Sequence, residues 1–420
     1  MKYKAIKGVK DILPEEIGKW HFIEKIAREL FQTFCYQEIR VPVFEKTNVF
    51  TRSIGENTDI VEKEMYTFKD KGDESISLRP EGTASIVRAY VEHQMYNPLS
   101  IVKLYYFGPM FRYERPQSGR YRQFYQIGIE AFGSKHPTLD AEVIFILIEF
   151  LRRIGLSNLE LNLNNIGCLD CRPGFRTELR NYFKSKLDRL CHNCNKRYIN
   201  NPLRILDCKN KECIQIVTEA PTIDNFRCHK CKTNFNQIQN LLDNLGVPFK
   251  INPKLVRGLD YYTMIAFEVL AGGLGAQNAV AGGGRYDGLV QDFGGPQIPA
   301  VGFAIGVERI ISLIENQDKF ILKPKAFIIS LGEENDKKVF QLLNELRMAN
   351  ISSDWSCGGS SLKSQMRKAD RSGADFVLIL GERESQSGKI ILRNMKTSNQ
   401  EEILQTDIVE KVKFRITNFQ

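Results

Sequence analysis

The clearest pattern of apolar positions lies at residues 14–35, where apolar side chains recur every three or four residues after Pro14. Lysine and glutamate fill the positions between them, and proline suits the first turn of a helix because that N–H has no partner anyway. The pattern predicts a long amphipathic helix. The stretch that follows, YQEIRVPVFE, has the composition of a strand. Because proline cannot donate to a ladder, Pro42 predicts an edge strand or a bulge.

Further along the chain, two patterns of period two stand next to helical ones. Residues 75–95 predict a strand, a break at Pro80 and Gly82, and then a helix. Residues 105–133 predict two strands rich in Tyr, Phe and Ile, joined by a polar loop that contains proline and glycine. The second segment is therefore expected to form a β-hairpin.

Residues 138–155 predict another amphipathic helix, and the string LELNLN alternates as a strand does. Residues 299–316 begin with small residues of strand type and continue with helical spacing. After Lys323 and Pro324, strand patterns alternate with helical ones to the end of the chain. This alternation predicts a separate α/β domain of about a hundred residues.

Composition adds bounds to this outline. The chain has 420 residues, of which 42% are hydrophobic, so it can hold two or three domains with real cores. No signal-peptide pattern opens the sequence and no apolar run reaches the length of a membrane span, which predicts a soluble cytoplasmic protein without membrane contact. The net charge of +9 fits a polyanionic partner but is also common in proteins that bind none.

The hairpin carries the strongest concentration of charge. Because side chains alternate along a strand, Arg112 and Glu114 are expected on one face of the first arm, and Gln126 and Glu130 on one face of the second. A charged face of this kind is often simply solvated. The alternative is that it binds a polyphosphate, since the planar fork of arginine suits phosphate oxygens.

Cysteines form the second unusual cluster. Eight of the ten lie in pairs between residues 168 and 231, and three pairs have the C-x-x-C spacing with which two thiolates grip one zinc ion. One or two structural sites of four cysteines each would stabilise a small subdomain. The expected ligands are Cys191, Cys194, Cys228 and Cys231. The alternatives are cysteines that bind no metal, and thiol exchange, although no thioredoxin-like pattern surrounds the pairs.

A family resemblance bears on both clusters. The string FRYERPQSGRYRQFYQIGIEAFG resembles motif 2 of the class II aminoacyl-tRNA synthetases, and its loop RPQSGRYRQF is similar to that of the histidyl-tRNA synthetases. The resemblance implies that Arg112 holds the α-phosphate of ATP and that Glu114 faces the adenine. It also implies that the loop around Gln117 and Arg122 meets the acceptor end of tRNA.

Three further strings, RPEGT, LVRGLDYY and AVAGGGRYDGLV, resemble sequences typical of histidyl enzymes, and PAVGFAIGVERI resembles motif 3. By resemblance, Arg309 contacts ATP, and Arg112 and Arg257 act on the α-phosphate as the catalytic pair. The implied histidine-binding residues are Glu81, Gly82, Thr83, Gln126, Glu130, Arg257, Tyr261, Tyr262 and Tyr286. Without the resemblance, the glycine-rich string would be a flexible turn, and Glu81 and Thr83 would merely cap a helix.

The resemblance also implies an architecture. It is an α+β fold in which residues 1–322 form a class II catalytic domain on an antiparallel sheet, with a cysteine-rich insertion at about 168–250, and residues 323–420 form an α/β anticodon-binding domain. The segment with the first helix resembles motif 1, which implies a homodimer. The implied activity is ATP-dependent ligation of L-histidine to tRNA(His) through histidyl-adenylate, with Mg²⁺, giving AMP and pyrophosphate.

Two other classes of protein compete with this interpretation. One is a synthetase-like regulatory subunit that binds histidine without charging tRNA; such proteins lack the anticodon domain and part of the arginine set. The other is a zinc-ribbon protein that binds nucleic acid, which would explain the cysteines but leave the remaining motifs without a role.

Overall fold

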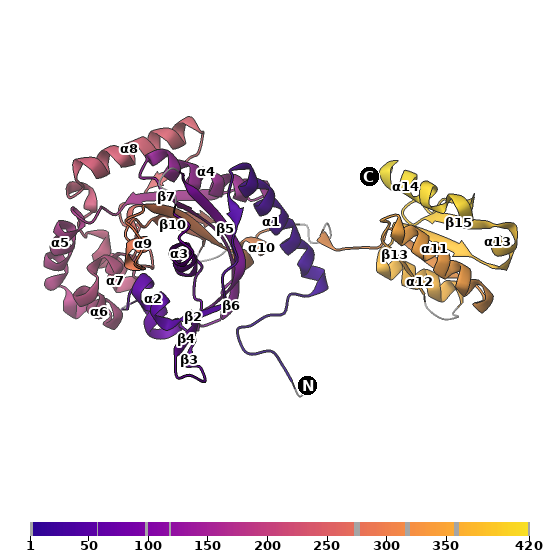
Figure 1. Ribbon diagram of the computed structural model, residues 1–420, viewed down its shortest axis with the longest axis horizontal. Coiled ribbons are helices and arrows are strands. Elements are labelled where there is room, and N and C mark those ends of the chain that lie inside the picture. The colour runs from indigo at the N-terminus through magenta and orange to yellow at the C-terminus, as the bar shows by residue number, and fades with distance from the viewer. Residues whose placement is uncertain are drawn as a thin grey trace. The chain divides into compact units, whose positions relative to one another are not determined.

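The amphipathic pattern after Pro14 forms helix α1 (Pro14–Thr33), which confirms the prediction. In the computed structural model the chain forms two compact units, residues 1–320 and 321–420 (Figure 1). The structure describes residues 3–56, 58–96, 100–116, 119–272, 278–315, 320–356 and 361–418.

An eight-stranded sheet organises the first unit. The predicted hairpin is its longest pair, β5 (Val102–Phe111) and β6 (Gln123–Phe132), which run antiparallel with Gly108 opposite Gln126. The strand order is β1-β5-β6-β11-β10-β9-β7-β8, and only the two short outer strands pair in parallel. The remaining strands are β1 (Gln37–Glu38), β7 (Leu159–Asn165), β8 (Lys250–Ile251), β9 (Thr263–Ala271), β10 (Ala279–Arg285) and β11 (Ala300–Gly306).

Three helices cover one face of this sheet: α1, α4 (Pro137–Arg153) and α8 (His229–Asn244). Their apolar stripes pack with the inward side chains of the central strands into one large core. Burial of this apolar area is the main term that stabilises the unit. Helix α8 comes from the end of the cysteine-rich segment, so part of that segment belongs to the main core.

The other face of the sheet is covered only in part. Helix α3 (Thr83–Glu92) packs there, with apolar residues of β5 and β6 and the short helix α9 (Leu289–Asp292). A small sheet lies beside it, in the order β2-β4-β3, made of β2 (Phe44–Lys46), β3 (Thr67–Lys69) and β4 (Ser75–Leu78). Helix α2 (Thr47–Ile54) follows β2. The uncovered part of the sheet face is where polar side chains gather.

The stretch around Pro42 differs from the prediction of one strand. It divides into β1, at the edge of the large sheet, and β2, in the small sheet. The guanidinium of Arg79 donates to the carbonyl oxygens of Val41, at 2.9 Å, and Pro42. The strand ends here because the backbone carbonyls bond to a side chain rather than to a neighbouring strand.

The cysteine-rich segment begins with helices α5 (Arg172–Lys184), α6 (His192–Asn200) and α7 (Lys211–Thr218). These helices share a small core of their own, which includes Phe175, Leu179 and Ile205. A core of this size stabilises a subdomain only weakly.

The second unit has the predicted alternation of strands and helices. Its sheet runs β13-β12-β14-β15-β16, with the first three strands parallel and the last two antiparallel. The strands are β12 (Ala326–Ser330), β13 (Ser353–Trp355), β14 (Phe376–Leu380), β15 (Lys389–Asn394) and β16 (Gln400–Leu404). The helices are α11 (Asp336–Met348), α12 (Leu362–Ser372), α13 (Glu382–Ser387) and α14 (Ile408–Asn418).

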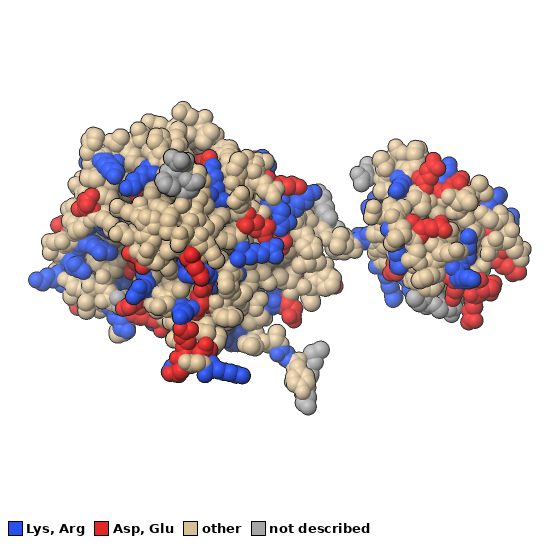
Figure 2. All heavy atoms as spheres, in the orientation of Figure 1, with Lys and Arg blue, Asp and Glu red and all other residues tan. Residues whose placement is uncertain are grey.

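Among the described residues, no helix combines the length and apolar character needed to cross a bilayer. Figure 2 shows Lys and Arg interspersed with Asp and Glu on the visible face of both units. The positive net charge is therefore not gathered into one basic patch on that face.

One buried ion pair ties a helix to the centre of the sheet. Arg285 of β10 donates from Nε and Nη2 to the two carboxylate oxygens of Asp140 in α4, at 2.9 and 2.8 Å. Neither side chain is more than 1% exposed. Arg285 also bonds to the Ser134 carbonyl and to Asp287, so the buried guanidinium is well supplied with acceptors.

We expect Asp140→Ala to lower the free energy of unfolding of this unit by about 3 kcal/mol, because the buried Arg285 charge loses its two-bond partner and keeps only a single bond to a carboxylate, that of Asp287. Urea unfolding in a Trp355→Phe background isolates the fluorescence of Trp20, the tryptophan of the first unit. Glu149→Ala on the same helix is the control, since it breaks only an exposed pair with Arg153 and should cost less than about 1 kcal/mol. Equal effects of the two variants would contradict the assignment.

Candidate active site

A pocket opens on the sheet face that α3 leaves uncovered. Its floor is formed by β6, β10 and β11, and its walls by the start of α3, the loop between β5 and β6, and the segment around Arg257. All of these elements belong to the first unit. The pocket therefore brings together parts of the chain from Glu81 to Arg309, which are far apart in sequence.

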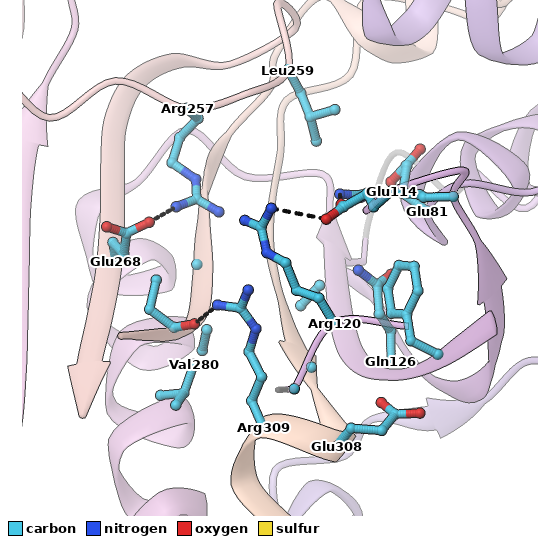
Figure 3. Close-up of a pocket in the computed structure, with 18 of the residues that line it drawn as sticks. Glu81, Glu114, Arg120, Gln126, Arg257, Leu259, Glu268, Val280, Glu308 and Arg309 are labelled. Carbon is cyan, nitrogen blue, oxygen red and sulfur yellow. Dashed lines mark hydrogen bonds and ion pairs between the residues drawn. The ribbon is translucent and has the colours of Figure 1, made fainter. Parts of the chain in front are cut away.

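Arginines of three different segments converge at the centre of this pocket: Arg120, Arg257 and Arg309 (Figure 3). Arg257 Nη1 bonds to Glu268 Oε1 at 2.6 Å, and Arg120 Nη1 bonds to Glu114 Oε2 at 2.8 Å. Burial lowers the pKa of Arg309, and the positive charge of Arg120 lowers it further. Within the described residues, the buried Nε atoms of Arg120 and Arg257 have no hydrogen-bond partner. A partly neutralised group of cations is suited to a polyanion.

The position of Arg257 depends on a glycine in the sheet. A Cβ atom at Gly282 would overlap the Arg257 guanidinium. The glycine-rich string is thus not a turn: Gly282, Gly283 and Gly284 lie within the central strand β10 and pair with both neighbours. The missing side chains let a charged group lie directly on the sheet surface.

Arg112 and Glu114 both line the pocket, but they do not lie on the first arm of the hairpin as expected. Strand β5 ends at Phe111: the Arg112 N–H still donates to the Arg122 carbonyl, but the next N–H, of Tyr113, donates to the Glu64 carbonyl instead. Arg112 Nε donates to the Pro80 carbonyl at 2.8 Å, and its guanidinium lies over the ring of Phe124. The side chain is therefore held between the break before α3 and the ring of Phe124 on β6.

Two buried carboxyl groups lie at the inner end of the site: Glu81 lines the pocket, whereas Glu130 bonds to the lining residue Thr83 and is not itself part of the lining. Glu130 accepts a hydrogen bond from Thr83 Oγ1 at 2.6 Å and another from the hydroxyl of Tyr286. Burial raises the pKa of Glu130 to about 8; the bonds from Thr83 and Tyr286 oppose the rise, and the Glu81 charge adds to it. Burial also raises the pKa of Glu81.

Glu81 has the capping role that the sequence left open as an alternative. Its carboxylate oxygens accept from the backbone N–H groups of Thr83 and Ala84, both at 2.8 Å, at the start of α3. Gly82 precedes that helix, and a side chain there would overlap the ring of Tyr106. The carboxylate lines the pocket as well, so capping and ligand binding are compatible.

Aromatic rings complete the inner wall. The rings of Tyr261 and Tyr262 lie 4.6 Å apart between centroids, and Tyr261 meets Tyr286 edge-on at 5.6 Å. The amide oxygen of Gln126 is buried there without a partner among the described residues. These side chains make a pocket that is polar yet largely shielded from water, and an unpartnered buried acceptor is suited to a ligand that donates.

Among the described residues, four sequence-predicted ones do not line the pocket: Gly82, Glu130 and Tyr286, which are buried next to lining residues, and Arg122. The guanidinium of Arg122 stacks on the ring of Tyr113 at 3.9 Å. Gln117 lies outside the described residues.

Sequence reasoning missed three residues that contribute to the site. Glu268 is a single charge within the apolar strand β9, which was a usable signal, and it fixes Arg257. Arg120 comes from the polar loop of the hairpin and pairs with Glu114. The carboxylate of Glu308 lines the pocket and accepts from the Tyr125 N–H at 3.0 Å; burial raises its pKa to about 7.

The cysteines predicted as one set of zinc ligands do not lie together. Cys228 and Cys231 lie in one group with Cys168 and Cys171. Cys191 and Cys194 belong to a second group, with Cys208 and Cys213. The expected set of 191, 194, 228 and 231 is therefore wrong as a single site, because helix α8 carries the last pair back to the end of β7.

The chain resembles known proteins over nearly its whole length. The family model described as histidyl-tRNA synthetase matches residues 8–310, and the model described as anticodon binding domain matches residues 325–415. The histidine–tRNA ligase of Halothermothrix orenii is 48% identical over 417 residues, which cover 98% of this chain and 99% of the relative. That of Desulforamulus reducens is 48% identical over 412 residues, covering 97% and 98%.

Among solved structures, that of apo S. aureus histidyl-tRNA synthetase has a TM-score of 0.83 and 38% sequence identity, covering 98% of this chain and 100% of that one. The expected α+β fold, with a large antiparallel sheet and a separate C-terminal unit, is confirmed. The chain belongs to the histidyl-tRNA synthetase family of class II aminoacyl-tRNA synthetases.

Proposed function

We propose that the pocket activates L-histidine with ATP to histidyl-adenylate and transfers the histidyl group to tRNA(His), releasing pyrophosphate and AMP. The observation that carries this proposal is the convergence of Arg120, Arg257 and Arg309 next to a shielded polar pocket. A polyphosphate and a small polar amino acid need these two environments side by side. The family resemblance identifies the polyphosphate as ATP and the amino acid as histidine.

In the first step, the histidine carboxylate attacks the α-phosphorus of ATP. Arg112 and Arg257 are the proposed catalytic residues on the α-phosphate, since fixed cations stabilise charge that grows in the transition state. Arg309 binds the phosphate tail, and Glu114 faces the adenine. These groups act through position and charge, because little covalent chemistry is required of the protein.

Mg²⁺ is the proposed partner of ATP. Carboxylate oxygens and substrate phosphates are the ligands that this ion prefers, and the lining offers Glu268 near the arginines. When bound, the ion would neutralise phosphate charge. Structural zinc is proposed for the cysteine-rich segment.

The histidine substrate is proposed to lie at the inner end of the pocket. Glu81 and Thr83 would hold its α-amino group, Arg257 its carboxylate, and Glu130 and Tyr262 its imidazole nitrogens. Pairing both nitrogens gives selectivity, because another amino acid would leave buried polar groups without partners. The remaining proposed contacts are Gly82, Gln126, Tyr261 and Tyr286.

In the second step, a hydroxyl of the terminal adenosine of tRNA attacks the activated carbonyl. Gln117 and Arg122 are proposed to meet the acceptor end. We propose residues 1–322 as the catalytic domain, with the insertion at about 168–250, and residues 323–420 as the anticodon-binding domain. The match to an anticodon binding domain supports the last point and disfavours a regulatory subunit. The cytoplasm, where tRNA and ATP are available, is the proposed location.

Arg257→Ala should slow histidyl-adenylate formation about 10²–10³-fold, because it removes one positioned cation from the transition state. Single-turnover formation of the adenylate with labelled histidine measures this step directly. Arg153→Ala, which removes an exposed arginine of α4, is the matched control and should leave the rate unchanged. An Arg257→Ala enzyme with the wild-type rate would refute the assigned role.

Glu130 should give histidine activation a pH dependence. Its carboxyl has a pKa of about 8 in the free protein, so it is mostly protonated at pH 7 and ionised above pH 8. Only the ionised form offers its full acceptor capacity to an imidazole N–H. We therefore expect log kcat/KM for histidine to rise through pH 7 and to level off near pH 8.

The matched variant is Glu130→Gln, which has nearly the same shape but does not titrate. In this variant, the inflection near pH 8 in the plot of log kcat/KM against pH should disappear. Only an inflection from the substrate imidazole, whose pKa is about 6.5 in solution, should remain. An identical inflection near pH 8 in both proteins would assign the titration to another group.

We also propose a homodimer. Support comes from the motif 1 resemblance of the segment with α1 and from the exposed apolar side chains of Val43 and Phe44 near the sheet edge. Sedimentation equilibrium at micromolar concentration should give about twice the chain mass of 48.2 kDa. A single species of monomer mass would contradict this proposal.

A further inference from the structure

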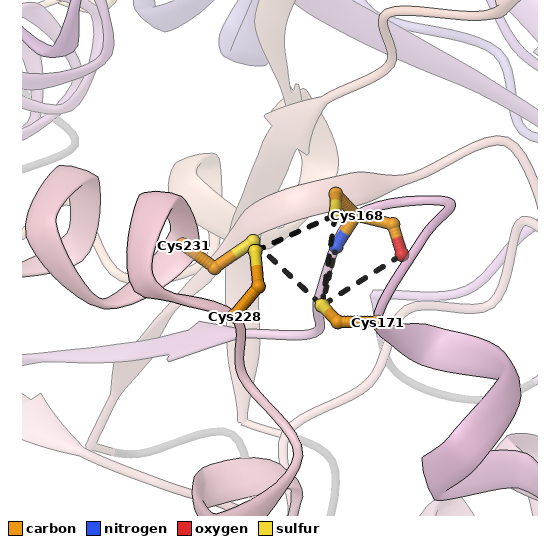
Figure 4. A group of neighbouring side chains, drawn as sticks. All are labelled: Cys168, Cys171, Cys228 and Cys231. Atoms are coloured by element: carbon orange, nitrogen blue, oxygen red, sulfur yellow. Dashed lines mark hydrogen bonds between the residues drawn. The ribbon is translucent and has the colours of Figure 1, made fainter.

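The eight paired cysteines form two separate groups of four in space. In each group, the four sulfur atoms all lie within 4.8 Å of one another. The first group joins the loop after β7, with Cys168 and Cys171, to the start of α8, with Cys228 and Cys231 (Figure 4). The second group lies within the small helical core and consists of Cys191, Cys194, Cys208 and Cys213.

The distances between the sulfur atoms match one particular geometry. Four thiolates around a zinc ion at about 2.3 Å form a tetrahedron whose edges measure about 3.8 Å. In the first group, Cys168 Sγ lies 3.6 Å from Cys171 Sγ and 3.9 Å from Cys228 Sγ, and Cys171 Sγ lies 3.8 Å from Cys231 Sγ. In the second group, Cys191 Sγ lies 3.8 Å from Cys208 Sγ.

We infer that the chain holds two structural zinc ions, one in each group, and that the first ion anchors the backbone of the histidine pocket. This inference deepens the zinc part of the proposed function, and its second clause rests on the proposed histidine pocket. Four thiolates fill a tetrahedral coordination sphere, which leaves no open position for a substrate. Both ions are therefore structural.

Other interpretations of the cysteines fit less well. A disulfide needs two sulfur atoms at about 2.05 Å, whereas these sulfurs are free and arranged in fours. Unpaired buried cysteines would have no reason to gather from four segments of the chain. Backbone N–H groups also point at the sulfurs, as expected around thiolate ligands: the Cys168 N–H to Cys171 Sγ at 3.3 Å, and the Cys191 N–H to Cys213 Sγ at 3.2 Å.

The small size of the local core explains why bound metal ions would be needed for stability. Helices α5, α6 and α7 share only a small apolar cluster, with several short helical turns between them. Such a subdomain buries too little apolar surface to hold its loops firmly, and a bound metal adds stability directly to folding. Cys194, Cys213 and Cys231 are fully buried, so ligands and core are continuous.

The first group connects to the proposed histidine pocket through Arg172, the residue after Cys171. Arg172 Nη2 donates to the carbonyl oxygen of Tyr262 at 2.7 Å, and Nε donates to that of Ile166 at 3.2 Å. On the other side, Asn165 Nδ2 donates to the Cys231 carbonyl at 3.0 Å. The ion would thus fix the loop after β7 and, through Arg172, the backbone of Tyr262. Arg172 is a positioning residue, since it acts on the pocket through that backbone.

The second group of cysteines lies near the other end of the segment that runs from Arg257 to Tyr262. Arg204, between its cysteine pairs, donates from Nη1 to the Gly258 carbonyl at 2.8 Å, next to Arg257. Arg197 pairs with Asp59 at 2.5 Å. The two groups therefore fasten the insertion to both ends of the segment that carries Arg257, Tyr261 and Tyr262.

The decisive experiment is the zinc content of the full-length protein, purified without chelator and measured by elemental mass spectrometry together with thiol titration. Wild type should carry two zinc ions per chain. Two variants with the same number of substitutions test the grouping. Cys168→Ser with Cys228→Ser falls within one group and should lose one zinc, whereas Cys191→Ser with Cys228→Ser spans both groups and should lose two.

Cys35→Ser is the control, because Cys35 is exposed and belongs to neither group, and it should retain two zinc ions. Wild type with no stoichiometric metal, or with iron in place of zinc, would overturn the inference. So would equal zinc loss in the two double variants. The wild-type measurement needs no variant to fold, and its result does not depend on whether the protein activates histidine.

The link to the pocket has its own readout. Removing the first ion by Cys168→Ser with Cys228→Ser should raise the KM for histidine about tenfold, with a smaller change in the KM for ATP, because Tyr262 loses its anchor. Arg172→Lys should do the same while keeping both zinc ions. An unchanged KM for histidine in both variants would overturn the link but leave the metal sites standing.

Discussion

The close approach of a guanidinium to a strand is the contact on which the site depends. Arg257 lies across β10 where residue 282 has no side chain, and a Cβ there would overlap it. The same arrangement occurs on the neighbouring strand β11. Gly302 pairs with Glu130 in the ladder, and a Cβ at Gly302 would overlap the Glu130 carboxylate. The central strands thus give up apolar contacts so that charged groups can lie on the sheet.

This arrangement has an electrostatic cost. Four arginines, Arg112, Arg120, Arg257 and Arg309, bring positive charge into a partly buried space, and the ion pairs with Glu114 and Glu268 neutralise that charge only in part. Like charges that are held close together by a rigid scaffold repel one another until an anion arrives. A triphosphate would relieve that repulsion, so the same preorganised charges would favour ATP binding and stabilise the transition state.

Patterns within one segment predicted much of the fold. The pattern and type of apolar residues predicted α1, α4 and the β5–β6 hairpin, because that signal is contained within each element's own segment of sequence. The stretch at Pro42 was predicted less well, since its division between two sheets depends on Arg79, which comes much later in the chain. The string around Gly282 was ambiguous for the same reason: only its neighbours β9 and β11 make it a strand.

The site was predictable where a motif spans consecutive residues, and not where contacts join distant ones. Glu268 was missed because only the fold brings it to Arg257. The cysteine pairs were visible in the sequence, yet their partners were not, because the spacing within a pair says nothing about which pairs meet. In the structure the first and last pairs along the chain, at 168 and 228, form one group, and the two pairs between them form the other.

The most direct test of the central claim is the exchange of labelled pyrophosphate into ATP by the wild-type protein, measured with each of the twenty amino acids in turn. If the polar end of the pocket is built for an imidazole and the arginines for a triphosphate, histidine alone should drive exchange. Exchange driven by another amino acid, or none at all in a protein that binds histidine, would contradict the account.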